Sequence, residues 1–362
     1  MNTQLLDIYC DYLLSSFGQT TATGLSTLVG GSISHDAITR MLSSERQTSK
    51  DLWHLVKPLV RTMESPDGVM IVDDSIAEKP YTDENDIVCW HYDHCVGRSL
   101  KGINFVTTLY YSQGQALPVA FELVAKTETY IDKKTQKEKR RSPISKNTYC
   151  QQMLQKAVEN QIPFRYVLSD VWFASAETIK FVKNDLKKDV VMPLKTNRHV
   201  ALSYADKHNG LYVRVDTLEW EENVPREIYL EGIDFPLLLV RQVFTNDDGS
   251  TGILYLIASD TTMTYDQITT TYQKRWRVEV YHKSIKQNAS LSKSPTHTVT
   301  TQANHFFAAV CAYSKLEMLA TSKKLNHTAL KTKLYISALQ QAFKELQLLQ
   351  PLQFSLQADC VR

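Results

Sequence analysis

The chain has 362 residues, 43% of them hydrophobic and 22% charged, so it is long enough for two or three structural units with a full core. Its formal net charge of +2 excludes a uniformly basic protein, and any contact with nucleic acid must come from local clusters of cations. A basic-then-apolar leader and a run of about 18 apolar residues are both missing, and the six cysteines are scattered, so we expect a cytoplasmic protein with reduced thiols and no membrane span.

Residues 1–65 are predicted to be helical, because apolar residues recur at helical spacing near both ends of this segment. Two short helices are expected over residues 23–29 and 34–42, joined at Gly30 and Gly31. The second begins at Ser34, a good helix cap. This arrangement is compatible with a helix-turn-helix that reads DNA, and equally with a small helical bundle that docks on the rest of the protein.

Acidic residues follow two apolar runs that read as buried strands. Residues 69–72 lead into Asp73 and Asp74, and residues 164–169 lead into Asp170. An aspartate in this position is most often a turn former. Ligands nevertheless gather at the carboxyl ends of strands in open sheets, so the pair is well placed for metal chemistry. Adjacent strand residues point to opposite faces, and only one of Asp73 and Asp74 can therefore face a given metal.

Between these two strands the chain predicts a hairpin over residues 101–111 and 116–123, and then a helix over residues 146–160. Residues 89–95 contain two cysteines and two histidines. Structural zinc sites normally combine ligand pairs from separate segments, so this single compact group favours a loop after the first strand over a zinc site.

The densest run of cations lies between the hairpin and the helix, over residues 133–146, and includes Lys139, Arg140 and Arg141. Such runs are usually solvated loops, but this one is also a candidate clamp for DNA phosphates.

The second half of the chain continues with a helix over residues 175–186 and short predicted strands at 190–194, 211–215, 227–230, 237–244 and 252–258, with a hairpin turn at 246–249. Trp220 is expected to pack in the core, and Lys195 and Arg198 to be solvated, in preference to DNA contact. Two structural helices are predicted over residues 301–319 and 330–348.

Four residues near the C-terminal third share the spacing Y-x2-R-x3-E-x6-K: Tyr272, Arg275, Glu279 and Lys286. On a single helix their offsets of 0, 3, 7 and 14 place them on one face. A carboxylate between cations and a phenol suits a metal ion beside a phosphate backbone, since the carboxylate would hold the metal and the others would meet phosphates. The alternative is a solvated, salt-bridged helix face.

With these motifs the chain resembles the bacterial insertion-sequence transposases of the DDE type, in the subgroup with a β-rich insertion before the glutamate. Asp73, in the form Asp-x-Ser, Asp170, followed two residues later by an aromatic residue, and Glu279 match the three acidic positions. The separations, 170 − 73 = 97 and 279 − 170 = 109, also suit that subgroup. The Asp-x-Ser form favours Asp73 over Asp74.

The resemblance implies an α/β fold: an RNase H-like mixed sheet flanked by helices, with a β-rich insertion and an N-terminal helical domain. The expected division is 1–65 for the N-terminal helical, possibly DNA-binding domain, 66–187 for the first part of the core, 188–259 for the insertion and 260–362 for the catalytic helix and C-terminal helices.

The resemblance also implies that Asp73, Asp170 and Glu279 hold two Mg²⁺ ions, for which Mn²⁺ can substitute, while Arg275 and Lys286 neutralise phosphates and Tyr272 hydrogen-bonds one. The implied partners are double-stranded DNA, as terminal inverted repeats and as target, and a second copy of the chain in a synaptic homodimer at the bacterial nucleoid. The implied reaction is cleavage at element ends followed by strand transfer. The alternatives are an RNase H-like nuclease without strand transfer and a non-catalytic DNA-binding derivative.

Overall fold

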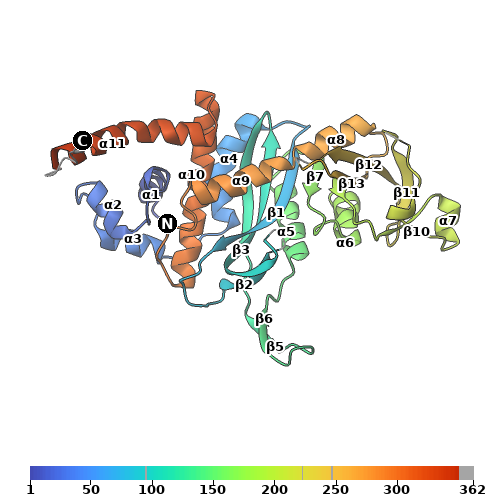
Figure 1. Ribbon diagram of the computed structural model, residues 1–362, viewed down its shortest axis with the longest axis horizontal. Coiled ribbons are helices and arrows are strands. Elements are labelled where there is room, and N and C mark those ends of the chain that lie inside the picture. The colour runs from blue at the N-terminus through green and yellow to red at the C-terminus, as the bar shows by residue number, and fades with distance from the viewer. Residues whose placement is uncertain (94–95, 222, 246–247, 350–362) are drawn as a thin grey trace, which may run out of the picture.

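The computed structural model describes residues 1–93, 96–221, 223–245 and 248–349 (Figure 1). The chain forms one large mixed sheet with helices packed around it, which confirms the predicted α/β fold with an RNase H-like core. None of the helices in these ranges combines the length and apolar character that a membrane span needs.

Five strands form the central part of the sheet, in the order β4-β3-β1-β7-β8. Strand β1 runs antiparallel to β3 and parallel to β7, and β8 is parallel to β7. A further strand, β2, pairs with the first half of β3. The bounds are β1 Val69–Glu78, β2 Val88–Asp93, β3 Arg98–Ser112, β4 Gln115–Leu123, β7 Tyr166–Ser169 and β8 Asp189–Pro193.

The predicted β-rich segment extends this same sheet beyond β8, in the order β8-β13-β12-β11-β9-β10. Its elements are β9 His199–Ala201, α7 Tyr204–His208, β10 Val213–Arg214, the short 3₁₀ helix η2 Val215–Thr217, β11 Arg226–Leu230, β12 Leu237–Thr245 and β13 Thr251–Ala258. Strand β8 opens this segment in sequence but lies in the central sheet. Trp220 packs against Tyr255 with 5.3 Å between ring centroids, as predicted. Part of the predicted turn at 246–249 lies outside the described residues.

The N-terminal segment is helical as predicted, with α1 Thr3–Ser15, α2 Ala22–Leu28, α3 His35–Leu42 and α4 Ser49–Met63. Side chains cap these helices, and Ser34 accepts the Ala37 amide at the start of α3, as expected. The two short helices thus exist, while their DNA-reading role stays a prediction, as does the division of the chain into four domains.

The remaining helices are α5 Lys146–Glu159, α6 Ala176–Lys180 with the π-helical turn η1 Phe181–Asp185, α8 Tyr265–Gln273, α9 Trp276–Gln287, α10 Val299–Lys323 and α11 His327–Leu349. Helix α10 is buried along most of its length and lies between the N-terminal helices and the sheet (Figure 1). Asn304 on α10 donates to the Leu42 and Ser44 carbonyls, which fixes the N-terminal helices to the core.

Two predicted loops are strands instead. Residues 89–93 belong to β2, where Cys89 and His91 are buried and Trp90 and Tyr92 exposed, because strand side chains alternate between faces. The Cys89 thiol lies 3.1 Å from the Asn85 carbonyl. His94 and Cys95 lie outside the described residues. The basic run supplies the turn and the second strand of a hairpin of β5 Glu128–Ile131 and β6 Glu138–Arg141, which projects from the body of the molecule (Figure 1).

Candidate active site

The two aspartates predicted from the strand pattern come together where β1 and β7 separate. The parallel pairing of these strands ends at Val72 opposite Ser169, so Asp73 and Asp170 are the next residues on each. The sequence suggested that the first strand ends just before Asp73. Strand β1 instead continues past Asp73 and pairs with β3 as far as Glu78. Because the pairing of these two parallel strands stops here, both carboxylates lie at the same end of the paired segment.

Asp73 and Asp74 point to opposite faces of β1, as predicted. Asp73 lies 3.1 Å from the Arg275 guanidinium, on the side of α8 and α9. Asp74 accepts from Lys146 of α5 at 2.6 Å and from Asn104 at 3.0 Å. Asp74 is therefore already paired with a cation of α5, although it lines the same groove as Asp73 and Glu279.

Asp170 also forms the local turn expected of an aspartate after a strand. Its Oδ1 accepts the backbone amides of Trp172 at 2.9 Å and Phe173 at 3.3 Å. This anchors the carboxylate and leads the chain into α6, which Ser175 caps. Burial raises the pKa of Asp170, and the charge of Asp74 adds to the rise.

The Y-R-E-K residues do not lie on one helix, contrary to the prediction. Helix α8 ends at Gln273 and α9 begins at Trp276. The Arg275 amide donates to the Tyr272 carbonyl, and the Val278 amide to the Arg275 carbonyl. These hydrogen bonds join residues three apart, as in a 3₁₀ helix, and replace for one turn the bonds between residues four apart that define an α-helix. The break thus separates Tyr272 from the helix that carries Glu279 and Lys286.

The side chains of Tyr272, Arg275 and Lys286 nevertheless contact the strands that carry the aspartates. Arg275 donates to Asp73 Oδ2 at 3.1 Å and to Glu279 Oε1 at 3.2 Å, and thus bridges the two carboxylates. Lys286 donates to the Ser75 hydroxyl at 2.7 Å. Tyr272 donates to the Ser169 carbonyl at 3.4 Å.

Burial in the site changes the proton affinity of Asp73 and Tyr272. Burial raises the pKa of Asp73 to about 8, and the negative charge of Asp170 acts in the same direction, while Arg275 opposes it. Burial likewise raises the pKa of Tyr272 to about 12. One guanidinium therefore does not compensate the negative charge gathered here.

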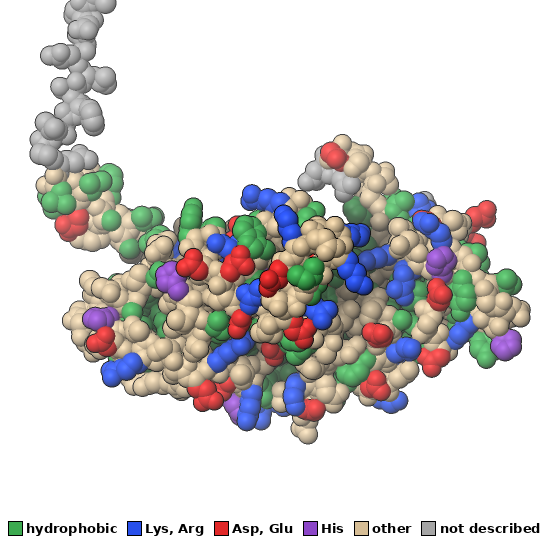
Figure 2. All heavy atoms as spheres, turned by 90° about the horizontal axis from the view of Figure 1, so that it is seen from below, with side chains coloured by type: hydrophobic (Ala, Val, Ile, Leu, Met, Phe, Trp, Pro, Cys, Tyr) green, Lys and Arg blue, Asp and Glu red, His purple; other side chains and the backbone are tan. Residues whose placement is uncertain are grey.

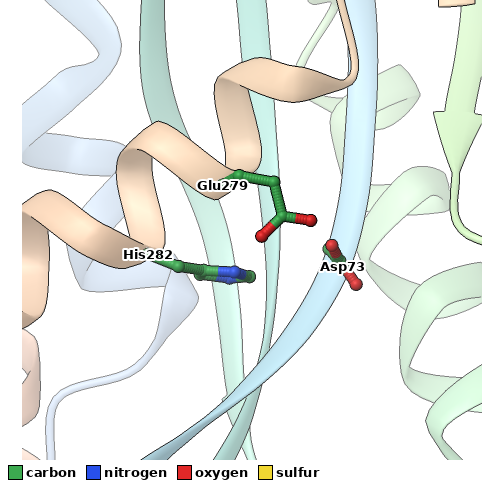
Figure 3. Close-up of side chains that lie close together, drawn as sticks. All are labelled: Asp73, Glu279 and His282. Atoms are coloured by element: carbon green, nitrogen blue, oxygen red, sulfur yellow. The ribbon is translucent and has the colours of Figure 1, made fainter. Parts of the chain in front are cut away.

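Sequence reasoning missed His282, which lies one helical turn beyond Glu279. Donor atoms of Asp73, Glu279 and His282 all lie within 4.8 Å of one another (Figure 3). Burial lowers the pKa of His282 to about 3, helped by Lys286 and Arg275, so the imidazole is neutral and keeps a lone pair. The only signal in the sequence is the i, i+3 offset from Glu279, which puts the two side chains on one helix face.

These residues line a groove with a volume of about 870 Å³. Asp170 lines it too, although it is not part of the group within 4.8 Å. Four cations also line this groove, contributed by α5, α9 and the residue before α9, namely Lys146, Lys283, Lys286 and Arg275. Figure 2 shows Lys and Arg side chains gathered beside a hollow on one face of the molecule. An acidic floor with basic walls fits a cation bound next to a polyanion.

The residues present fit a divalent cation. Carboxylate oxygens are the donors that Mg²⁺ and Mn²⁺ prefer. Burial, and then the negative charge of Asp170, raise the pKa of Asp73, and a divalent ion would favour its ionised form. Arg275 supplies one positive charge between Asp73 and Glu279. Within the part of the chain that the structure describes, His282 Nε2 is buried and has no hydrogen-bond partner, which leaves it available as a metal ligand.

Comparison with known proteins identifies the family of the chain. A family model described as DDE superfamily endonuclease matches residues 2–209, more than half of the chain. The chain belongs to the DDE superfamily of endonucleases. A second family model, described as transposase DDE domain, matches residues 144–315. No curated protein matches the chain. The resemblance inferred from the three acids and the Y-R-E-K spacing is thus confirmed, and the protein is a transposase-type DDE nuclease that acts on DNA and uses divalent metal ions.

The predicted phosphate clamp of this DDE nuclease lies mostly outside the groove, since Lys146 lines the groove while Lys139, Arg140 and Arg141 do not. The last three cations pair with acids on the surface: Lys139 with Asp132, Arg140 with Asp86 and Arg141 with Glu128. Exposed ion pairs of this kind contribute little to stability, so phosphates can compete for the cations at little cost. DNA binding by Lys139, Arg140 and Arg141 stays a prediction.

Lys195 and Arg198 were expected to be solvated. Lys195 is exposed, and its ammonium lies 4.3 Å from the ring centroid of Trp172. Trp172 lines the groove two residues after Asp170. The DDE nuclease therefore has an aromatic side chain and a cation next to its acids that the sequence analysis did not assign to the site.

Proposed function

We propose that this DDE nuclease cuts DNA at the ends of a mobile element and then joins the freed 3′ ends to target DNA, which is cut-and-paste transposition. The observation that supports this best is the convergence of acids from three distant segments: Asp73 and Asp170 follow the last paired residues of β1 and β7, and Glu279 meets Asp73 from α9.

In this proposal Asp73, Asp170 and Glu279 hold two divalent ions, Mg²⁺ or in its place Mn²⁺. Such a pair activates the attacking oxygen and stabilises the leaving 3′ oxygen during in-line displacement at phosphorus. Asp73 is the ligand from β1 because it faces Glu279, whereas Asp74 is held by Lys146. With divalent ions bound to Asp73 and Glu279, the Arg275 guanidinium that now bridges these carboxylates would be free to contact DNA.

Arg275, Lys286 and Tyr272 then turn to the DNA backbone. Arg275 and Lys286 neutralise phosphates near the cut, and Tyr272 donates a hydrogen bond to one. Lys139, Arg140 and Arg141 hold the flanking duplex from the β5–β6 hairpin. The DNA partners are the terminal inverted repeats of the element and a target duplex, and two copies of the enzyme bring the two ends together as a homodimer.

The test uses DNA that carries the sequences flanking the gene. The enzyme is incubated with this DNA in Mg²⁺ and the cut ends are mapped, and separately with pre-cut ends and a target plasmid. We expect cuts at a defined repeat and a joined plasmid product. Cuts without joined product would favour the nuclease without strand transfer. If neither cut DNA nor joined product formed in Mg²⁺ or in Mn²⁺, the result would favour the non-catalytic DNA-binding derivative.

A further inference from the structure

His282 has no role in the Y-R-E-K motif, yet its side chain reaches the carboxylates (Figure 3). It is 6% exposed, and its Nε2 has no hydrogen-bond partner among the described residues. A buried nitrogen without a partner is unfavourable for folding, so a ligand that the protein itself does not supply would explain its presence here.

Other buried histidines show what a structural role looks like. His305 on α10 is bonded at both nitrogens, with Nδ1 3.0 Å from the Tyr9 hydroxyl and Nε2 3.1 Å from the Ser290 carbonyl. His91 on β2 also has an unpartnered Nε2, but it belongs to no group of potential metal ligands within the described residues. His282 alone of these three combines an unpartnered nitrogen with two nearby carboxylates.

The imidazole of His282 is held in place by aromatic neighbours. Phe105 of β3 meets it edge to face, with 5.7 Å between centroids and 84° between the rings. Tyr281 packs on it at 5.4 Å. Phe105 pairs with Ser75 across β1 and β3, so it lies on the same face of the sheet as Asp73. The ring is thus fixed on the side of the acids.

We propose that His282 is a direct ligand of the divalent ion held between Asp73 and Glu279, an inference that rests on the proposed function. Metal–ligand bonds of about 2.0–2.3 Å place donors on opposite sides of an ion about 4–4.6 Å apart. Donor atoms within 4.8 Å of one another therefore need only small side-chain movements to surround one ion. The Arg275 guanidinium leaves when the ion binds.

A nitrogen donor changes which metal the site prefers. Mg²⁺ and Mn²⁺ both favour oxygen ligands, but Mn²⁺, as a first-row transition metal, accepts an imidazole nitrogen more readily than Mg²⁺ does. An Asp-Glu-His set should therefore bind Mn²⁺ more tightly than Mg²⁺, by a wider margin than carboxylates alone would give.

The test measures the bound metal and not the reaction. The full-length protein is loaded with one equivalent of Mn²⁺ without DNA, and electron spin echo modulation from directly coordinated ¹⁴N is recorded. We expect this modulation in the wild-type protein and in His91→Gln, the matched control with another buried, unpartnered imidazole. It should vanish in His282→Gln and in wild-type protein labelled with ¹⁵N-histidine, which keeps the conclusion independent of how the variant folds.

Affinity gives a second measurement. Mn²⁺ binding to His282→Gln, measured by calorimetry, should weaken by about tenfold or more, because losing even a group that only orients a metal ligand costs about that much. Mg²⁺ binding should change less.

The outcomes separate this inference from the proposed function. Bound Mn²⁺ that shows no ¹⁴N modulation in the wild-type protein, but is lost in Asp73→Asn, overturns the role of His282 and leaves the acidic metal site intact. Wild-type protein that binds no Mn²⁺ contradicts the metal site itself, and with it both proposals.

Discussion

At the scale of single residues, the buried carboxyl of Asp73 lowers the stability of the folded protein when it is ionised. Its carboxylate is 8% exposed and lies near another aspartate, and its pKa rises from 3.8 to about 8. The folded protein therefore holds this proton more tightly than the unfolded chain between about pH 4 and pH 8. Stability from this group is present below its ordinary pKa and is lost as the pH rises through that window.

Asp73→Asn should consequently stabilise the metal-free protein. Removing the buried charge should raise the free energy of unfolding at pH 8 by about 1–3 kcal/mol, with a smaller gain near pH 5, where the wild-type carboxyl is protonated. Urea unfolding at the two pH values, in the presence of a chelator, measures the difference. A variant less stable than wild type at pH 8 would show that the Arg275 pair outweighs the cost of burial.

Glu279→Gln should abolish strand cleavage in Mg²⁺ and leave binding to the terminal repeats nearly unchanged. The amide keeps the size of the side chain but removes the charge that holds a metal, while Lys286 and Tyr272 remain to bind phosphates. A cleavage assay and a gel-shift assay on the same DNA test this, with Glu159→Gln on the exposed end of α5 as control. Cleavage retained by the Glu279 variant would remove Glu279 from the mechanism.

Asp73, Asp170 and Glu279 could be proposed from sequence because each is adjacent to a recognisable local pattern, either an apolar strand-like run or the Y-R-E-K spacing. The apolar runs before Asp73 and Asp170 form strands, and their parallel pairing brings the two acids together. His282 could not be predicted in the same way. Whether an imidazole finds a hydrogen-bond partner depends on Phe105, Asp73 and the packing of α9 on the sheet, none of which is local to it.

At the scale of elements, periodicity predicted most helices and long strands but not their interruptions. The break between α8 and α9 lies within a continuous helical pattern, and three-residue hydrogen bonds at Lys274 and Arg275 cause it. Strand β9 has three residues, too few for a periodic pattern to appear. The basic run 133–146 looked like a loop because its charges mask the alternation of a hairpin that is exposed on both faces.

The β5–β6 hairpin can be tested as an element. Replacing Lys139, Arg140 and Arg141 with alanine should weaken DNA binding uniformly across sequences. It should also reduce the slope of log K against log salt by about 2–3, since each lost phosphate contact contributes about 0.9. Fluorescence anisotropy at several salt concentrations measures the slope, with Lys156→Ala and Lys187→Ala on the surface as controls. An unchanged slope would exclude the hairpin as a phosphate clamp.

At the scale of the whole molecule, α10 joins the N-terminal helices to the catalytic sheet. The Asn304 side chain bonds the Leu42 and Ser44 carbonyls and accepts the Gln47 amide at 2.9 Å. Asn304→Ala should destabilise the protein by about 1–3 kcal/mol, because these buried backbone groups would lose their partner. Thermal unfolding should show one transition at a lower temperature, while Ser322→Ala at the exposed end of α10 should change little. An unchanged midpoint would mean that water replaces the amide.

The central claim is that Asp73, Asp170 and Glu279, brought from β1, β7 and α9, together hold divalent ions. Anomalous diffraction from crystals grown with Mn²⁺ measures this most directly, since it locates each ion and its ligands. The account predicts ions coordinated by all three carboxylates, with the Arg275 guanidinium displaced from between Asp73 and Glu279. Full occupancy by Mn²⁺ elsewhere, with Arg275 still bridging these two carboxylates, would contradict it.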